Sequence, residues 1–179
     1  MQKSKIILII TLFLLGKYLH AQPYIPGQTY WGTRQYIEYQ PGNLPLIISV
    51  PHGGYEQPSD IRDRQCEGCA YVQDAFTQEL ARTIREIFVK ETGCYPYMIY
   101  NRIHRKKLDM NRDIIMATDS NSSLDVYWHE YHNFIDSAKK HITLHFGKGL
   151  FIDLHGHGHT KQRIEYGYLV YDSQLRESD

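Results

Sequence analysis

The stretch of residues 149–170, GLFIDLHGHGHTKQRIEYGYLV, decides the fold that we expect for this chain. Its first part, residues 150–154, is a short apolar run that predicts a buried strand with polar groups at its carboxyl end. Because side chains alternate between the two faces of a strand, every second residue from position 153 would lie on one side if the extended backbone continued. Those residues are Asp153, His155, His157 and His159.

Three histidines within five residues favour a transition-metal site at this point of the chain. A polar loop with solvated imidazoles is the alternative. Gly156 and Gly158 allow the backbone to turn or to approach a ligand closely. The stretch closes with residues 164–171, which predict a second strand that carries one acid, Glu165.

The segments before this stretch alternate between predicted strands and predicted helices. Strands are expected at residues 46–50 and 96–100, with a short edge strand at 36–39. A helix is expected over residues 74–91, with an apolar face made by Phe76, Leu80, Ile84, Ile87 and Phe88. Another is expected from about Asp125, with an apolar face made by Tyr127, Tyr131, Phe134, Ile135, Ala138 and Ile142. This alternation predicts an α/β fold, a three-layer sandwich around a mainly parallel or mixed central sheet.

The charge balance limits the kinds of partner that we expect, and the length limits the number of domains. The chain has 179 residues, and its 20 Lys and Arg residues balance its 20 Asp and Glu residues. A nucleic-acid binder would show a basic excess, so we expect no nucleic-acid partner. The length predicts one domain, over residues 22–179, and the polar residues 172–179 leave open whether that domain is complete. The oligomeric state is not predicted by these features.

Residues 1–21 have the pattern of a secretory signal peptide. Lys3 and Lys5 precede an apolar run, residues 6–15, that is too short to cross a bilayer as a helix, and Ala21 is a small residue at the predicted cleavage point. We therefore expect a periplasmic or secreted protein with no stable membrane span after cleavage. An uncleaved anchor is the alternative.

The cysteines fit the same expectation, because disulfides persist in exported proteins. Cys66 and Cys69 can close a small loop as a structural disulfide, which leaves Cys94 free. A bond from Cys94 to either of the other two is the alternative. No second Cys-x-x-Cys pair exists to complete a zinc knuckle.

Three separate segments carry potential metal ligands. His52 follows the predicted strand 46–50, Asp74 stands at the start of a predicted helix, and His155 follows the predicted strand 150–154. Two imidazoles and one carboxylate, with a position left open, suit a catalytic zinc or another divalent transition metal.

Each of these assignments has an alternative. Asp74 can act only as the cap of the helix that follows it. Glu56 lies close after His52 and is a rival for the carboxylate ligand. His157 and His159 are rivals of His155, or lie behind the ligands.

Other polar residues supply the groups that amide hydrolysis needs. Arg112 with Asn111 can grip a carboxylate, and Asp109 can orient Arg112 or its loop. Structural ion pairing within residues 101–113 is the alternative for Asp109. Arg105 offers a second cation for the substrate or for the oxyanion that develops during reaction. Glu165 is the candidate that takes a proton from water and delivers it to the leaving amine; an ordinary acid at a strand edge is the alternative.

Four motifs, in this order along the chain, resemble those of the N-formylglutamate amidohydrolases. They are SVPHGG at residues 49–54, LDMNR at 108–112, YH at 131–132 and DLHG at 153–156. The resemblance implies a phosphorylase/hydrolase-like fold, similar to zinc carboxypeptidases and aspartoacylases, and a metal-dependent hydrolysis of an acidic N-acyl amino acid. It makes His52 and His155 metal ligands, favours Asp74 as the third, and makes Asn111 and Arg112 the carboxylate clamp.

The same resemblance places His132 among the substrate-binding residues. The chain departs from the zinc carboxypeptidases and aspartoacylases at Tyr55, where they have a Glu, and Glu56 is one residue further on. Glu165 and Gly167 look like the Glu-x-Gly around the aspartoacylase base, but lie closer to the second histidine. A signal peptide also differs from what a cytoplasmic histidine-degrading enzyme needs.

We therefore predict a secreted metal-dependent amidohydrolase that acts on a small carboxylate-bearing amide, such as an N-acyl or N-formyl acidic amino acid. A zinc carboxypeptidase-like or cell-wall amide hydrolase is one alternative. A metal-binding or ligand-binding protein without turnover is the other.

Overall fold

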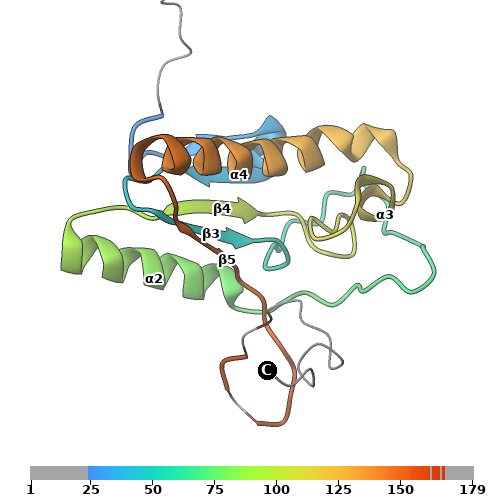
Figure 1. Ribbon diagram of the computed structural model, residues 1–179. Coiled ribbons are helices and arrows are strands. Elements are labelled where there is room, and N and C mark those ends of the chain that lie inside the picture. Colours follow the sequence, from blue (N-terminus) through green and yellow to red (C-terminus); the bar gives the residue numbers. More distant parts are fainter. Residues whose placement is uncertain (1–23, 162, 166, 168–179) are drawn as a thin grey trace, which may run out of the picture.

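The computed structural model describes residues 24–161, 163–165 and 167. The expected signal peptide, and residues 166 and 168–171 of the expected last strand, lie outside this part. A five-stranded sheet, in the order β1-β2-β4-β3-β5, forms the centre of the fold (Figure 1). The strands are β1 (Tyr30–Trp31), β2 (Ile37–Gln40), β3 (Leu46–Val50), β4 (Tyr97–Asn101) and β5 (Leu150–Asp153).

The sheet is mixed, which confirms the predicted α/β class. β3 runs parallel to both β4 and β5, while β2 pairs antiparallel with β4 and with β1. The carboxyl ends of the three parallel strands therefore lie at the same edge of the sheet. β2 is not the edge strand that we expected, because β1 pairs along its outer side.

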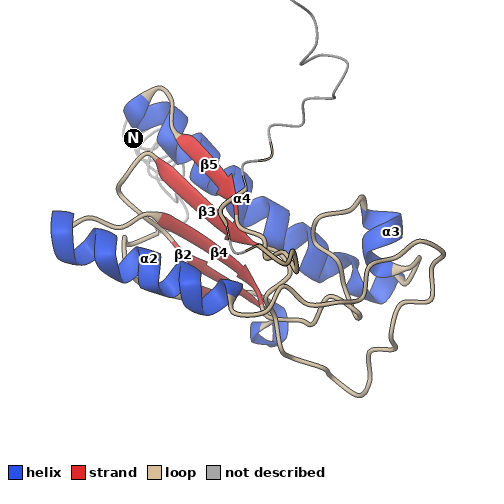
Figure 2. Cartoon of the chain, turned by 90° about the horizontal axis from the view of Figure 1, so that it is seen from below, coloured by secondary structure: helices blue, strands red, loops and turns tan. Residues whose placement is uncertain are grey.

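Two long helices cover opposite faces of the sheet (Figures 1 and 2). The helix α4 (Asp125–Phe146) begins where the sequence predicted and buries five residues of the predicted face, with Phe134 packed beside them. The buried residues are Tyr127, Tyr131, Ile135, Ala138 and Ile142. The helix α2 (Thr77–Thr92) covers the other face.

Shorter elements complete the described fold. They are the helix α3 (Ile114–Thr118) and two 3-10 turns, η2 (Thr33–Gln35) and η3 (Ser122–Leu124). None of the helices in the described part of the chain combines the length and the apolar character that a membrane crossing requires.

The hydrophobic core lies in two parts, one on each face of the sheet. Alternation along the strands decides the division, since Ile47 and Ile99 point towards α4 while Ile48 and Met98 point towards α2. The part under α4 is the larger. The part under α2 is small and is made by Ile48, Val50, Ala81, Met98 and Tyr100.

The predicted apolar face of α2 is wrong in large part. Leu80 is 49% exposed and Ile87 is 55% exposed, and Phe76 lies before the helix and points to solvent. The buried residues are Thr77, Gln78 and Ala81 instead. The amide of Gln78 donates to the Asn101 carbonyl at 2.8 Å, so a polar contact at the amino end decides which side of the helix meets the sheet.

The strand β5 has the predicted position but not the predicted burial. Leu150, Phe151 and Ile152 are all exposed by more than a third, because β5 pairs with β3 on one side only within the described residues. Among residues 164, 165 and 167, none is in a strand. The disulfide between Cys66 and Cys69 is present as expected, and Cys94 is free.

Candidate metal centre

His52, Asp74 and His155 meet at the carboxyl edge of the parallel strands. The two Nδ1 atoms of His52 and His155 are 3.1 Å apart. Oδ2 of Asp74 lies 3.1 Å from Nδ1 of His155 and 3.5 Å from Nδ1 of His52. The three predicted ligands, drawn from distant parts of the chain, thus present one donor atom each to a common point.

The backbone around His52 explains how these segments come together. The loop after β3 passes so close to its neighbours that a Cβ at Gly53 would collide with Thr77, and one at Gly54 with the backbone of Arg102. Glycine is therefore required at both positions. The amide of Asp74 donates to the His52 carbonyl at 3.1 Å, which fixes the segment before α2 against the loop.

Two carboxylates determine which ring nitrogen of each histidine is free. Nε2 of His52 lies 2.6 Å from Oδ1 of Asp109, and Nε2 of His155 lies 3.0 Å from Oδ2 of Asp153. An ionised carboxylate only accepts, so each Nε2 carries a proton and donates it. Carboxylates hold metal-binding histidines in this way, and the arrangement leaves the Nδ1 lone pairs directed at one another.

This arrangement of donors fits a divalent transition metal. Two lone pairs and a carboxylate oxygen around one point repel each other unless a cation, a metal ion or a proton, lies between them. Ligand atoms bound to a tetrahedral zinc lie roughly 3.3–3.6 Å apart, close to the separations of the three donor atoms. His52 is buried, whereas the His155 side chain is 36% exposed, so the centre is open on one side.

The charges of the centre depend on its burial. Burial alone would raise the pKa of Asp74, but the contacts with His155 and His52 and the hydrogen bond from the Gly156 amide lower it well below its usual range. The carboxylates of Asp153 and Asp74 raise the pKa of His155 to about 9. A proton therefore competes with a metal ion for the Nδ1 atom of His155.

The structure contradicts two alternatives, the role of Asp74 as a helix cap and the role of Glu56 as the carboxylate ligand. Phe76, with φ at 63°, takes the cap position of α2 and no side chain caps the helix, so Asp74 is not a helix cap. Glu56 is turned away from the centre, because its carboxylate accepts from Arg102 at 2.8 Å and is 46% exposed. Of the acids considered from the sequence, only Asp74 joins the two histidines.

His157, His159 and Glu165 form a separate exposed group. Nδ1 of His159 lies 2.8 Å from Oε1 of Glu165, and Arg163 donates to the same oxygen at 2.6 Å. Within the described residues, no hydrogen bond or ion pair joins Glu165 to His52, Asp74 or His155. The structure therefore does not place Glu165 where the predicted proton acceptor has to lie, and His157 and His159 do not replace His155.

Arg105 does lie beside the centre. Its Nε donates to Oδ2 of Asp109 at 3.0 Å, and its Nη1 is 3.6 Å from Oδ1 of Asp74. The guanidinium of Arg105 thus contacts the proposed ligand Asp74 and also Asp109, the carboxylate that orients His52. Arg105 therefore lies at the site as predicted and contacts one proposed ligand, Asp74, while its role towards a substrate or an oxyanion stays a prediction.

Two of the predicted substrate-binding residues, Asn111 and His132, line a pocket of about 520 Å³, and Arg112 is not among the residues that line it. Nδ2 of Asn111 lies 3.2 Å from Nε2 of His155. Arg112 is exposed, and its guanidinium takes part in no ion pair among the described residues; it donates only to the Asn111 carbonyl, at 3.5 Å. Nε2 of His132 donates to the Met110 carbonyl at 3.2 Å, and burial lowers the pKa of His132.

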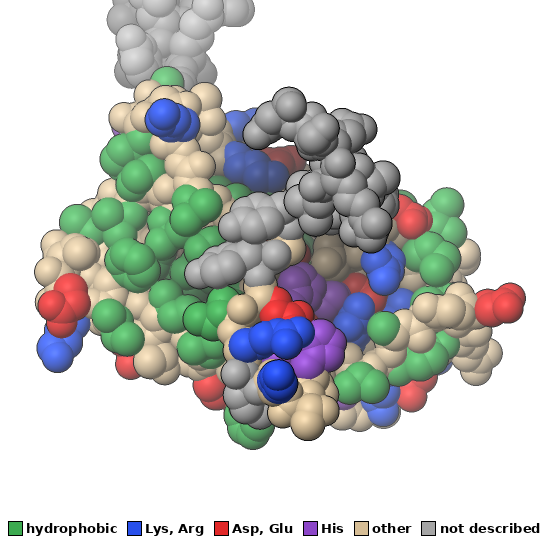
Figure 3. All heavy atoms as spheres, turned by 60° about the horizontal axis from the view of Figure 1, so that its bottom comes forward, with side chains coloured by type: hydrophobic (Ala, Val, Ile, Leu, Met, Phe, Trp, Pro, Cys, Tyr) green, Lys and Arg blue, Asp and Glu red, His purple; other side chains and the backbone are tan. Residues whose placement is uncertain are grey.

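The pocket lies between α4 and β5, and the other residues that line it are a mixture of apolar, polar and charged side chains. They are Pro51, Met110, Trp128, His129, Tyr131, Asn133, Ile135, Asp136, Lys139, Phe151 and Asp153. Figure 3 shows that acidic, basic and histidine side chains gather on one face of the molecule beside a broad hydrophobic area.

Comparisons with protein-family models, with curated proteins and with solved structures gave no match to this chain. The resemblance to the amidohydrolases thus rests on the four motifs. The geometry of the centre is independent of that resemblance.

The sequence did not reveal the roles of Asp109 and Asp153. Asp109 was expected to orient Arg112 or its loop, or to form an ion pair within residues 101–113. Its carboxylate accepts from the Asn111 backbone amide and pairs with Arg105, and its contact with His52 was not expected. Asp153 was placed on the side of the histidines, and it proves to hold His155. The spacing of Asp153 and His155, two residues apart at the end of a strand, is the one signal in the sequence from which this pair could have been predicted.

Proposed function

We propose that this protein is a metal-dependent amidohydrolase of the three-layer, zinc exopeptidase-like class, with His52, Asp74 and His155 as the metal ligands. One observation carries the proposal. The Nδ1 atoms of two histidines and one carboxylate oxygen face each other within 3.5 Å, while Asp109 and Asp153 hold the opposite ring nitrogens. Zinc, or another divalent transition metal, is the cation that we propose for this centre.

When bound, such a metal makes a coordinated water more acidic and polarises a carbonyl oxygen. The residues of the chain do the rest in this proposal. Asp109 and Asp153 keep the two histidines in the tautomer that binds, and Arg105 stabilises the negative charge that develops on the carbonyl oxygen of the amide. The open side of the centre, at His155, is where the amide enters.

We propose a small carboxylate-bearing amide as the substrate, with an N-acyl or N-formyl acidic amino acid as the first choice. The exposed guanidinium of Arg112 has no ion-pair partner among the described residues, so a carboxylate can take that place. Asn111 lies between Arg112 and His155, which brings the bound carboxylate close to the centre. His132 lines the adjoining pocket.

A second candidate function, metal or ligand binding without turnover, is favoured by the position of Glu165. Its carboxylate is neutralised by Arg163 and His159 and is not joined to the centre. The other carboxylates that touch the centre, Asp109 and Asp153, are engaged by the histidines that they orient. Without a carboxylate that accepts the proton of the water, the protein would bind a metal ion or a ligand and would not hydrolyse it.

One experiment separates the two functions. The purified chain is analysed for bound metal and incubated with N-formyl and N-acetyl derivatives of glutamate, aspartate, glutamine and leucine, with and without a chelator. We expect hydrolysis of the acidic derivatives that stops in chelator and returns with zinc. Stoichiometric metal without any hydrolysis would favour the binding function, and hydrolysis that persists in chelator would exclude the proposed chemistry.

The variant Arg112→Ala tests the carboxylate clamp in the same assay. Loss of a charge-assisted pair is expected to lower kcat/KM for acidic derivatives by roughly 10–100-fold. The leucine and glutamine derivatives keep only the α-carboxylate, so acidic and neutral derivatives reveal which carboxylate Arg112 holds. Equal kcat/KM of the wild type and the variant on every substrate would remove Arg112 from the site.

A further inference from the structure

Arg64 is a buried cation at the side of the metal centre that faces the protein interior. Its side chain is 1% exposed, and its guanidinium donates to three backbone carbonyls. These are the carbonyls of Arg105, Ala70 and Met116. One side chain therefore ties together the loop around residue 70, the segment after β4 and the helix α3.

Arg64 also contacts the carboxylate that orients His52. Nη2 of Arg64 lies 3.5 Å from Oδ2 of Asp109, which is itself 1% exposed. The same oxygen accepts from Arg105 at 3.0 Å, while Oδ1 holds Nε2 of His52 at 2.6 Å. Arg64, Asp109 and His52 thus form a buried chain of contacts that ends at a proposed metal ligand.

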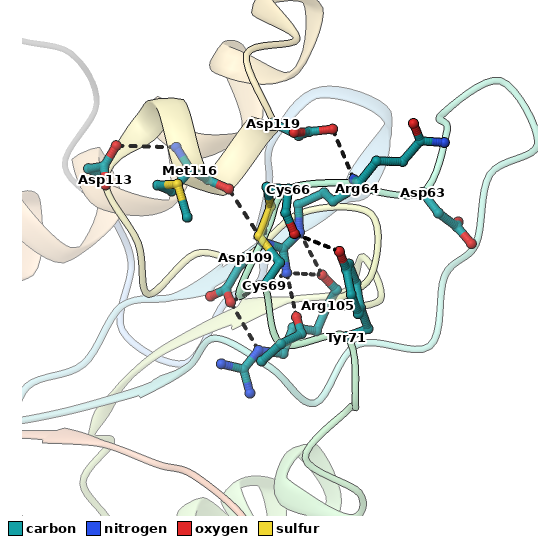
Figure 4. Close-up of a disulfide and its surroundings, with 12 residues drawn as sticks. Asp63, Arg64, Cys66, Cys69, Tyr71, Arg105, Asp109, Asp113, Met116 and Asp119 are labelled. Carbon is teal, nitrogen blue, oxygen red and sulfur yellow. Dashed lines mark hydrogen bonds and ion pairs between the residues drawn. A yellow bond between two sulfur atoms is a disulfide. The ribbon is translucent and has the colours of Figure 1, made fainter.

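The disulfide supports the other side of the Arg64 guanidinium. Nη1 lies 3.2 Å from Sγ of Cys69 and 3.8 Å from Sγ of Cys66, and the amide of Cys69 donates to the Cys66 carbonyl at 3.3 Å. Figure 4 shows the disulfide, Arg64, Arg105 and Asp109 as neighbours. The closed turn therefore presents two sulfurs and the Ala70 carbonyl to one guanidinium.

We infer that Arg64 is a positioning residue for the metal centre and that the Cys66–Cys69 disulfide holds Arg64 in place. The inference rests on the proposed metal ligands, and it assigns a role to a disulfide loop that has no contact with them. Without Arg64, the Asp109 carboxylate loses one of its two arginine partners, and the carbonyls of Ala70, Arg105 and Met116 lose a donor. Asp109 and the loop that carries it then shift, and His52 is no longer held in the orientation that binds.

Cobalt(II) binding to the full chain provides the test, because its affinity and its visible d–d absorption both report on the ligands. In Arg64→Met, which keeps much of the volume and removes the charge and the fork of donors, we expect an affinity lower by about 10–100-fold, as for other residues behind metal ligands. We also expect a changed d–d spectrum at saturation. Arg64→Lys keeps the charge and should recover part of the affinity.

The Cys66→Ser/Cys69→Ser double variant tests the disulfide while keeping Arg64. We expect weaker cobalt binding here also, by less than in Arg64→Met. This variant decides the question if Arg64→Met does not fold, as judged by circular dichroism. The matched controls are Arg62→Met, whose guanidinium pairs with Asp119 at the surface, and Cys94→Ser; both should bind cobalt as the wild type does.

The outcomes separate this inference from the proposed function. Wild-type affinity and spectrum in both Arg64→Met and the double cysteine variant would overturn the role of Arg64, while the metal centre stands. A loss of equal size in Arg62→Met would also overturn it, because the effect would then belong to the loop in general. Absence of cobalt binding in the wild type would instead overturn the metal centre itself.

Discussion

At the scale of single residues, the centre depends on carboxylates placed behind imidazoles. Asp109 and Asp153 each accept from an Nε2 atom, and this directs both Nδ1 atoms to one point. Asp74 completes the group because hydrogen bonds keep it ionised despite its burial. The chemistry of the site thus depends on three acids of which only one is a proposed ligand.

The first prediction concerns Asp74. Asp74→Ala should lower the zinc content of the purified chain from about one ion to a small fraction of that, since a tetrahedral site loses one of three protein ligands. Inductively coupled plasma mass spectrometry measures this directly.

A matched control for Asp74→Ala is Asp113→Ala, because Asp113 is a true helix cap that accepts from the amides of Ile115 and Met116. This control should lose about 1 kcal/mol of stability and keep its zinc. Full zinc occupancy in Asp74→Ala would exclude Asp74 as a ligand.

The second prediction follows from the raised pKa of His155, about 9. Below that pH the metal-free imidazole carries a second proton, which a metal ion has to displace. The zinc affinity should therefore fall about tenfold for each unit of pH below 9 and level off above it, as measured by competition with a chelator. An ordinary histidine would level off near 6.5.

Asp153→Asn provides the control for this pH dependence. Asp153 is the main cause of the raised pKa of His155, so its amide variant should level off at a lower pH than the wild type. An identical pH profile in the two proteins would show that Asp153 does not hold His155.

At the scale of elements, the sequence predicted positions better than it predicted faces. The predicted strand 46–50 and the predicted start of the helix at Asp125 agree with the structure. An unbroken apolar run of this length is typical of a buried strand, and a regular apolar face over many residues is typical of an amphipathic helix. The face of α2 was wrong, since contacts of Gln78 and the close approach at Gly53 determine how that helix lies. Neither contact is visible in the periodicity of apolar residues.

The third prediction compares two isoleucines that periodicity alone would treat alike. Ile99, fully buried under α4, should cost about 2–5 kcal/mol of stability when changed to alanine. Ile87→Ala, on the exposed side of α2, should change the stability by no more than about 0.5 kcal/mol. Urea unfolding of both variants measures the difference, and a large loss in Ile87→Ala would contradict the observed packing of α2.

At the scale of the whole molecule, the position of the metal centre could be predicted from the sequence, whereas the position of Glu165 relative to it could not. Potential ligands after the predicted strands 46–50 and 150–154 were expected to meet because parallel strands share a carboxyl edge, and the structure brings His52 and His155 together there. Glu165 was assigned as the nearby acid that hydrolysis needs, and its Glu-x-Gly surroundings resemble a short motif of the aspartoacylases. Its neighbours Arg163 and His159 bind it instead, and spacing along a chain does not reveal such local pairing.

The fourth prediction is that the metal stabilises the fold as a whole. A ligand present at 100 times its Kd adds about 2.7 kcal/mol to the free energy of unfolding, which corresponds to a rise in Tm of roughly 5–10 °C for a domain of this size. Thermal unfolding with and without zinc should show this rise in the wild type. The Asp74→Ala variant should unfold at the same temperature in both conditions.

His52 and His155 lie 103 residues apart in the chain, and β3 has to pair with β5 before they can meet. A nascent polypeptide that has not yet emerged as far as His155 has only one of the two histidines of the proposed metal centre. In the proposed function, the complete set of three ligands therefore forms only after β5 has been synthesised and has paired with β3. With the export that the sequence predicts, this order would place metal binding after translocation.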